Sequence, residues 1–215
     1  MQIKDKVVII TGGASGIGAA LARRLILEGA QVVIGDIDQK SGQELLTELN
    51  QNNKTNAIFV FCDVTNVDHL RQLFDTAQNT FGGVDIVCNN AGISPIEYFD
   101  QTDIWIKIID INLNAVIKGT QLGIGFLKKR GGGVIINTDK IRVNAIAPGF
   151  VDTPMMKKTV KLMPAVVQGV EKLGYVPIDE VVNAFITIIL DDKLVGDTIM
   201  IPKKNFSQII SKSFL

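Results

Sequence analysis

The first 90 residues alternate between short apolar runs and longer segments with helical periodicity. Four apolar runs have the composition of buried strands: 6–12, 30–36, 57–63 and 84–90. Between them, apolar residues recur three and four positions apart, which predicts amphipathic helices over 16–29, 39–52 and 66–82. Near-continuous apolar strands separated by such helices are typical of a parallel sheet covered on both faces. The pattern therefore predicts an α/β fold with a doubly wound parallel sheet.

The alternation fails after a long helical region at 103–130. The runs 133–138 and 141–147 both have strand composition, but only Asp139 and Lys140 lie between them. Parallel neighbours need a crossover of roughly a dozen residues, so two residues predict a tight antiparallel turn instead. Asp-Lys is also a poor hairpin pair, because the favoured turns place Gly or Asn at positive φ. The sequence thus indicates that the crossover helix between the fifth and sixth strands is missing.

The alternation recovers after this junction. The remaining predicted elements are one or two short helices around Pro164 in 155–174, an apolar helix at 179–192 and a last strand at 197–202. No internal repeat, low-complexity tract or linker divides the chain. We therefore expect a single domain, made of a cofactor-binding half at 1–138 and an incomplete C-terminal part at 139–215.

Composition and charge narrow the class of protein. The chain has 215 residues, 47% of them hydrophobic and 20% charged, which is typical of a globular domain. Lys+Arg and Asp+Glu balance at 22 each, so no net charge favours nucleic acid or an anionic membrane. No apolar stretch approaches the roughly 20 residues of a membrane-spanning helix, and the N-terminal run Val7–Ile10 is too short for a signal peptide.

The cysteines and the histidine point to no metal site. Cys62 and Cys88 both lie in strand-like runs, where buried free thiols are expected. Free thiols suit a reducing compartment, so we expect a cytoplasmic protein. His69 is the only histidine and has no Cys or second His near it, so a surface or helix-start residue is favoured over a metal ligand.

The turn after the first strand carries the stretch "TGGASGIG" at 11–18. Gly12, Gly16 and Gly18 fall in this turn and at the start of the next helix. Glycine there lets a pyrophosphate approach the backbone, and the helix N-terminus offers free N–H groups and a positive dipole end. Asp36 ends the second strand, where a carboxylate can bind both adenosine ribose hydroxyls and would repel a 2′-phosphate. NAD is therefore favoured over NADP, although Asp36 can also be a simple turn or cap residue.

Two further strand ends extend this cofactor hypothesis. Asp63 follows the third strand and can meet the adenine amino group, with a helix cap or turn residue as the alternative. The stretch "NNAG" at 89–92 ends the fourth strand. Its small residues allow close approach to the cofactor, and Asn90 can hydrogen-bond the ribose. Taken alone, "NNAG" would be an ordinary turn.

Together these motifs resemble the short-chain dehydrogenase/reductase family nearly end to end. The resemblance rests on "TGGASGIG", Asp36, "DV" at 63–64, "NNAG", Asn112 and "PG" at 148–149. Within the family, the segments 111–124, 144–155 and 184–201 most resemble NAD-dependent hydroxyprostaglandin dehydrogenases. The resemblance implies a seven-stranded Rossmann sheet, a dimer, and reversible hydride transfer between NAD and a secondary alcohol or ketone, such as a hydroxylated fatty acid.

The motifs and the resemblance assign one set of residues to the NAD site. They are Gly12, Ser15, Gly16, Ile17, Gly18, Asp36, Ile37, Asp63, Val64, Asn90, Ala91, Gly92, Pro148, Gly149, Val151 and Thr153.

The catalytic residues of the family are missing, apart from a supporting Asn matched by Asn112. In the family a Ser follows the fifth strand, and a Tyr-x-x-x-Lys on the next helix supplies the general acid/base and the Lys that lowers its pKa. Here Asp139 stands where the Ser is expected, and neither Tyr98 nor Tyr175 begins a Tyr-x-x-x-Lys. Lys140 is interpreted as a solvated turn residue. The chain is therefore expected to be inactive.

Three interpretations remain open. The chain derives from an NAD-dependent dehydrogenase and has lost its activity, it is a catalytically dead module that binds NAD or a partner, or it is a spliced or misjoined product. The loss should expose the apolar face of 103–130. If the sixth strand does not dock beside the fifth, the segment 148–154 will not reach the nicotinamide. Four apolar residues are candidates for a substrate lid or for ordinary core: Met155, Met156, Leu162 and Met163.

Overall fold

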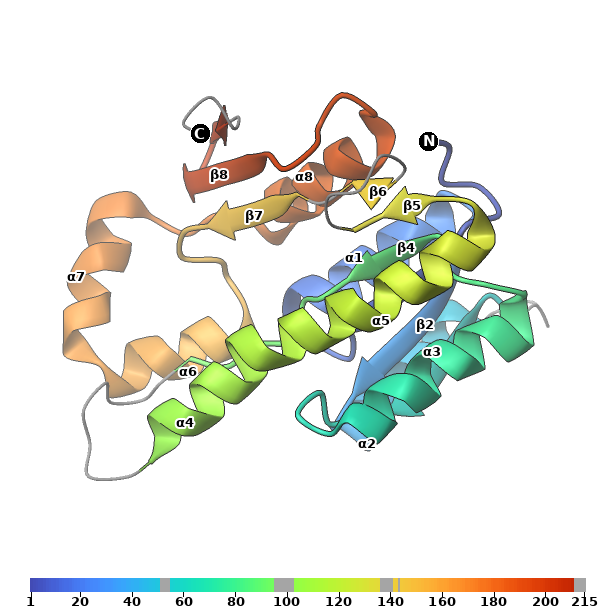
Figure 1. Ribbon diagram of the computed structural model, residues 1–215. Coiled ribbons are helices and arrows are strands. Elements are labelled where there is room, and N and C mark those ends of the chain that lie inside the picture. The colour runs from blue at the N-terminus through green and yellow to red at the C-terminus, as the bar shows by residue number, and fades with distance from the viewer. Residues whose placement is uncertain (51–54, 95–102, 136–140, 143, 211–215) are drawn as a thin grey trace.

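The computed structural model describes residues 1–50, 55–94, 103–135, 141–142 and 144–210. Its main sheet has six strands in the order β3-β2-β1-β4-β5-β6, and every neighbouring pair is parallel (Figure 1). These strands are β1 (Val7–Thr11), β2 (Gln31–Asp36), β3 (Ala57–Phe61), β4 (Ile86–Cys88), β5 (Gly133–Val134) and β6 (Ile141–Arg142). The doubly wound parallel sheet predicted from the alternation is confirmed.

Helices cover both faces of this sheet. The covering helices are α1 (Gly16–Leu27), α2 (Gln39–Leu49) and α8 (Ile178–Leu190) on one face, and α3 (Val67–Phe81) and α5 (Ala115–Arg130) on the other. The remaining helical elements are α4 (Ile104–Ile109), the π-helical turn η2 (Asp110–Asn114), α6 (Pro154–Leu162) and α7 (Pro164–Leu173). The alternation of side chains along β1 divides the core in two. Val8 and Ile10 pack with α1, α2 and α8, whereas Val7 and Ile9 pack with α3 and α5.

Local signals explain the ends of α3. Asn66 caps its first turn, because its Oδ1 accepts hydrogen bonds from the main-chain N–H groups of Asp68 and His69. Gly82 ends the helix in the left-handed conformation with φ of 79°. The predicted Asn cap is confirmed, and it fixes the position of His69 relative to the end of β3.

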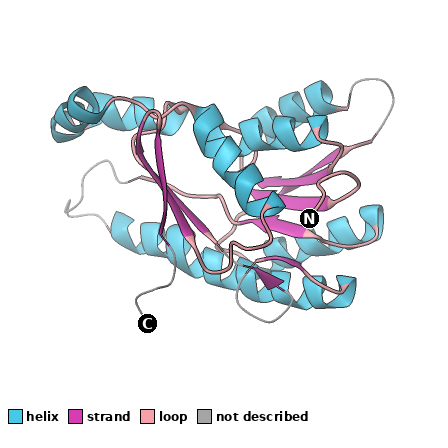
Figure 2. Cartoon of the chain, turned by 90° about the horizontal axis from the view of Figure 1, so that it is seen from above, coloured by secondary structure: helices cyan, strands magenta, loops and turns pink. Residues whose placement is uncertain are grey.

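A second sheet forms from the C-terminal part of the chain. It contains β7 (Ala145–Pro148), β8 (Thr198–Lys203) and β9 (Phe206–Ile210), with β7 parallel and β9 antiparallel to the central β8. Figure 2 shows these strands standing apart from the six-stranded sheet. The single seven-stranded sheet implied by the family resemblance is therefore wrong, because the expected sixth strand is divided between two sheets as β6 and β7.

The junction after β5 also differs from the prediction. Gly133 and Val134 pair with Ile141 and Arg142 in parallel, so the expected antiparallel turn is not formed. The reason lies in the length of β5, which ends at Val134 rather than at residue 138. Six residues then separate the paired segments instead of two. Asp139 and Lys140 fall outside the described residues.

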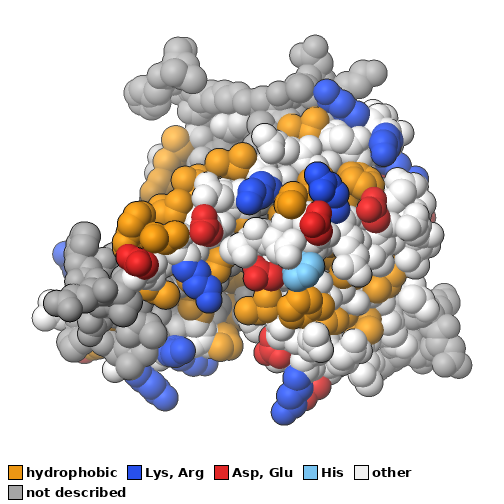
Figure 3. Space-filling model, turned by 60° about the horizontal axis from the view of Figure 1, so that its bottom comes forward, with side chains coloured by type: hydrophobic (Ala, Val, Ile, Leu, Met, Phe, Trp, Pro, Cys, Tyr) orange, Lys and Arg blue, Asp and Glu red, His pale blue; other side chains and the backbone are white. Residues whose placement is uncertain are grey.

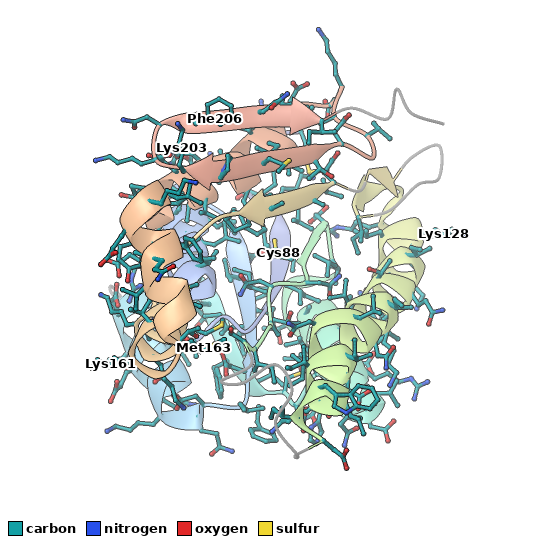
Figure 4. The ribbon with its side chains drawn as sticks, turned by 90° about the vertical axis from the view of Figure 1, so that its left-hand side faces the viewer. Cys88, Lys128, Lys161, Met163, Lys203 and Phe206 are labelled. Atoms are coloured by element: carbon teal, nitrogen blue, oxygen red, sulfur yellow. The ribbon has the colours of Figure 1, made fainter. Side chains whose placement is uncertain are left out.

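Helix α8 joins the two sheets. Ile199 and Ile201 of β8 belong to the same buried cluster as Leu25 of α1 and Val182 of α8. Figure 4 shows Cys88 inside the molecule, with Lys203 on β8 and Phe206 on β9 of the second sheet. Both sheets therefore share one apolar core on the α1–α8 side.

Candidate cofactor site

A cleft opens at the carboxyl ends of β1, β2, β3 and β4. The chain leaves β1 toward β2 on one side and reaches β4 on the other, which makes this a switch point where α/β proteins bind ligands. The cleft has a volume of about 250 Å³. It is lined by Gly12, Ser15, Gly16, Ile17, Asp36, Ile37, Cys62, Asp63, Val64, Asn90, Ala91, Gly92, Ile93, Ile111, Thr153, Pro154 and Met155.

The glycine turn leaves no room for side chains. Gly12 has φ of 63°, and a Cβ there would lie 2.7 Å from the Cα of Ala91. A Cβ at Gly18 would lie 2.3 Å from the carbonyl oxygen of Gly12, so Gly18 permits α1 to pack closely on the turn and does not itself line the cleft. Gly16 and Ile17 begin α1 at the cleft, where first-turn N–H groups have no acceptor within the helix. This arrangement fits a pyrophosphate.

Asp36 has two roles in the structure. Its Oδ2 accepts a hydrogen bond of 2.9 Å from the main-chain N–H of Ala14, and its Oδ1 accepts one of 3.1 Å from that of Asp38. The carboxylate therefore fixes the glycine turn and also lines the cleft. Each oxygen has a further lone pair, which suits the two hydroxyls of an adenosine ribose. The adjacent Ile37 is 63% exposed and offers an apolar surface beside this carboxylate.

Asp63 likewise shapes the loop and lines the cleft. Its Oδ1 accepts hydrogen bonds from the hydroxyl of Thr65 at 2.7 Å and from the Thr65 N–H at 2.9 Å. The Thr65 hydroxyl is the largest cause that holds the pKa of Asp63 below its usual value. The carboxylate is therefore ionised at neutral pH. The predicted turn role is observed, and the predicted contact with adenine stays a prediction.

Asn90 ties the glycine turn to β4. Its side-chain Nδ2 donates hydrogen bonds of 3.0 Å to the carbonyl oxygens of Thr11 and Gly12. The main-chain N–H of Asn90 donates to the Thr11 hydroxyl at 3.1 Å. Both amide protons are therefore used within the protein, and only the Oδ1 of Asn90 can meet the predicted ribose.

Asn112 holds the loop that follows β4. It lies in the π-helical turn η2, a feature often found at functional sites. Its Oδ1 accepts from the main-chain N–H of Ile93 at 2.9 Å, and its Nδ2 donates to the Ile93 carbonyl at 2.8 Å. Because Ile93 lines the cleft, Asn112 positions one cleft wall. Its matching role in a proton relay stays a prediction.

The C-terminal segment reaches the cleft despite the divided sheet. Thr153, Pro154 and Met155 line it, and the Thr153 hydroxyl accepts from the Met156 N–H at 3.2 Å to cap α6. A Cβ at Gly16 would lie 3.5 Å from the Thr153 methyl group. Thr153 and Pro154 of the segment 148–154 therefore lie at the cleft, and their contact with a nicotinamide stays a prediction.

Three residues assigned to this segment serve the fold instead. Val151 is buried and bridges to Val176, and the Gly149 N–H donates to the carbonyl of Ile201 at 2.8 Å. Neither these two residues nor Pro148 lines the cleft. Of the four residues predicted here, only Thr153 lies at the site.

Five cleft residues were not assigned to the cofactor site from the sequence: Cys62, Ile93, Ile111, Pro154 and Met155. Met155 was a candidate for a substrate lid. All five lie within two positions of a residue that was assigned a site role, so proximity to the motifs was the available signal. Cys62 was expected to be a buried free thiol, which the structure confirms. Burial, aided by the charges of Asp63 and Asp36, raises the pKa of this thiol to about 12.

The cleft carries few groups capable of proton transfer. Among its described lining residues, the titratable side chains are Asp36, Asp63 and Cys62. The two carboxylates follow β2 and β3, whereas Ile93, Ile111 and Thr153 form the other end. No described lining residue is a His, Tyr or Lys. Tyr98, Asp139 and Lys140 lie outside the described residues.

Within the described part of the chain, no helix is both long and apolar enough to cross a membrane. The same residues contain no group of three or more His, Cys, Asp or Glu side chains suited to a metal ion.

Comparison with known proteins identifies the family. A family model described as short chain dehydrogenase matches residues 6–139, which is more than half of the chain. The glycine turn, the switch-point cleft and this match agree, and the chain belongs to the short chain dehydrogenase family.

Individual relatives extend over most of the chain. A bovine (Bos taurus) protein named 15-hydroxyprostaglandin dehydrogenase [NAD(+)] is 30% identical over 246 residues, covering 91% of this chain and 90% of that protein. A 3-alpha-(or 20-beta)-hydroxysteroid dehydrogenase of Mycobacterium bovis is 34% identical over 192 residues, covering 72% of each. A solved short-chain type dehydrogenase/reductase from Mycobacterium marinum has a similar fold, with a TM-score of 0.81 and 22% identity over 93% of this chain and 95% of that one.

Proposed function

We propose that this chain binds NAD(H) in the cleft but does not itself oxidise an alcohol. One observation supports the proposal: the glycine turn and Asp36 line one cleft that would suit a pyrophosphate and an adenosine ribose, while the sequence contains no Tyr-x-x-x-Lys. The reaction from which the chain derives would be NAD-dependent oxidation of a secondary alcohol, with a hydroxylated fatty acid, prostaglandin or steroid as the substrate class named by its relatives.

The cofactor part of the proposal has two supports. The bovine relative is named for NAD(+). Asp36 places a negative charge where the 2′-phosphate of NADP would lie, so NAD is favoured. When bound, NAD would supply the hydride acceptor. The α1 N-terminus would bind its pyrophosphate, and Asp36 its adenosine ribose.

The lack of activity follows from proton balance. When a secondary alcohol becomes a ketone, the hydride leaves carbon for the nicotinamide and the hydroxyl proton must pass to a base. Such proton transfer contributes about 10²–10⁴-fold to a rate. Cys62 remains a neutral thiol at neutral pH because its pKa is about 12. The carboxylates of Asp36 and Asp63 already accept hydrogen bonds that hold the turns after β1, β2 and β3. No described cleft residue therefore provides the base.

Two comparison results support a missing segment. The family match ends at residue 139, beside the junction where the crossover is expected. The alignment with the bovine relative is 246 residues long, whereas the whole chain has 215, so that relative carries positions without a counterpart here. The end of the family match at this junction is the result that favours the loss of a piece here.

The test separates binding from turnover. NADH fluorescence and melting temperature should both change on titration, and Asp36→Ala should weaken the binding. NADPH should bind less well than NADH. With NAD and a panel of secondary alcohols, including hydroxylated fatty acids, no NADH should form above a heat-killed control. Absence of binding at millimolar NADH would refute the cofactor proposal, and turnover that Asp36→Ala reduces would refute the proposed inactivity.

A second candidate function is the binding of a partner chain. Helices α4 and α5 with η2 expose Trp105, Ile106, Ile109, Leu113 and Ile117, each more than 40% exposed. This apolar stripe is the observation that favours a dimer or another partner. The third interpretation, a spliced or misjoined product, is tested by sequencing the native transcript between the codons for Thr138 and Ile141. The buried free thiols Cys62 and Cys88 support a cytoplasmic location.

A further inference from the structure

The single histidine of the chain lies beside the proposed cofactor site. His69 is in the first turn of α3, and its ring packs edge-on against Phe61 with the ring centroids 5.3 Å apart. Its Nδ1 accepts a hydrogen bond of 3.3 Å from the main-chain N–H of Asp63. A ring nitrogen that accepts carries no proton, so this contact requires a neutral imidazole with its proton on Nε2.

The Asp63 peptide controls one wall of the cleft. Asp63 and Val64 lie between β3 and α3, and both line the cleft. Thr65 holds the carboxylate of Asp63, while His69 holds its main-chain N–H. The imidazole therefore links the rigid first turn of α3 to the loop that would contact the adenosine half of NAD.

We propose that His69 is a positioning residue for this end of the cleft and weakens cofactor binding when it becomes protonated. The inference rests on the proposed binding of NAD(H). Protonation would place an N–H on Nδ1 opposite the N–H of Asp63, and two donors cannot share a hydrogen bond. The loop would then lose its hold on α3. Loss of one such hydrogen bond corresponds to about threefold to tenfold weaker binding.

The charged groups around the imidazole also indicate that its protonation would disturb the loop and weaken cofactor binding. Asp63 faces it from the end of β3, and on α3 itself Asp68 and Arg71 pair with each other at 3.1 Å. Lys107 of α4 acts electrostatically on the Asp63 carboxyl, as His69 does. Figure 3 shows the imidazole in pale blue at the surface, with acidic side chains nearby. A protonated imidazole would attract the Asp63 carboxylate, which would further disturb the loop.

Two neighbouring groups keep their charge in the relevant range. An imidazole changes charge between about pH 5 and pH 8. The pKa of Asp63 is lowered, so this carboxylate stays ionised there. The pKa of Cys62 is about 12, so its thiol stays neutral. A change in affinity within this range that depends on residue 69 is therefore assigned to the imidazole.

Calorimetric titration with NAD+ and with ADP-ribose, from about pH 8 to about pH 5.5, tests the proposal. The unmodified chain should bind both ligands about threefold to tenfold more weakly at the lower pH. His69→Asn keeps a neutral acceptor near the position of Nδ1, so its affinity should stay high and vary little with pH. His69→Leu removes the acceptor and should bind weakly at both pH values. Arg71→Gln, an exposed change on the same helix, should keep the original pH profile.

A second readout needs no ligand. The amide N–H resonance of Asp63 should shift in NMR spectra as the pH falls, and this shift should vanish in His69→Asn. The proposal would be overturned if ligand affinity varied with pH equally in the unmodified chain and in His69→Asn. It would also be overturned if the Asp63 amide resonance were the same in both proteins at every pH. If no ligand binds at any pH, the proposed function fails, while the Asp63 amide still decides whether His69 holds this loop.

Discussion

At the scale of single residues, several side chains both line the candidate site and hold the fold together. The sequence predicts Asp36 as a ribose ligand because it ends the second apolar run, but it does not predict the hydrogen bond from Ala14. Asn90 shows the same limit, because its amide protons bond to carbonyls on another strand. Sequence spacing reveals which residues meet at a strand end. It does not reveal how their hydrogen bonds are shared.

The close packing at Gly18 gives a direct prediction. Gly18→Ala would place a methyl group 2.3 Å from the Gly12 carbonyl oxygen and force α1 away from the glycine turn. We expect a loss of about 2–3 kcal/mol, a melting temperature about 5–10 °C lower, and weaker NADH binding. Gly125→Ala in α5 is the matched control, because a Cβ there meets nothing within 4 Å. Equal melting curves for both variants would contradict the packing argument.

The two cysteines should be unreactive in the folded chain. Burial raises the pKa of each thiol to about 12, with the charges of Asp63 and Asp36 adding to the effect at Cys62. At pH 8 we expect alkylation at least about a hundredfold slower than for a free thiol, since the thiolate is the reactive form. Mass spectrometry should find both sites labelled only after unfolding in guanidinium. Rapid labelling of Cys62 in the folded chain would contradict this prediction. If NADH suppressed that labelling, the reactive thiolate would lie in the cleft.

At the scale of elements, the sequence predicted most helices and strands but not the division of one strand. The alternation of apolar runs located β1 to β4 and α1 to α3, because each element buries a distinct face. The run at 141–147 reads as one strand, yet β6 and β7 join different sheets. Strand composition cannot reveal this division, because it indicates that a segment is buried but not which strand it pairs with. β9 was also missed, and all five of its residues are exposed.

The apolar stripe on α4, η2 and α5 should cause association. In Figure 3 a band of hydrophobic side chains marks this side of the molecule. The double change Ile109→Lys and Ile117→Lys should reduce concentration-dependent association in sedimentation velocity, because both side chains are exposed and lie on the stripe. Leu27→Lys on α1, where the side chain is 84% exposed, is the control and should leave association unchanged. Association that survives the double change would place the interface elsewhere.

At the scale of the whole molecule, α8 makes the two sheets one structure. Its buried residues contact α1 on one side and the second sheet on the other, so the C-terminal part is held although β7 does not continue the main sheet. This packing also brings Thr153 to the cleft beside Gly16. The C-terminal part thus reaches the cleft although the strands of the chain are divided between two sheets.

A substitution in α8 tests this coupling. Ile189 is 2% exposed, and Ile189→Ala should cost about 3 kcal/mol through the cavity it leaves. Fluorescence of Trp105 on α4 and hydrogen exchange of β8 amides should report the same loss of stability. Leu190→Ala, at the neighbouring position that is 49% exposed, should change little. Separate transitions for the two probes would mean that the sheets unfold independently.

The division of the sheet also bears on how the chain is made. Val7 of β1 meets its β2 partner Gln31 after 24 residues, and β3 and β4 pair with strands that are already made. Ala145 of β7 must wait 53 residues for Thr198 of β8. At about 5–20 residues per second, the nascent chain carries β7 unpaired for several seconds. An apolar segment left waiting in this way is a substrate for chaperones. The yield of this protein in a cell should therefore depend on them more strongly than on the stability of the finished fold.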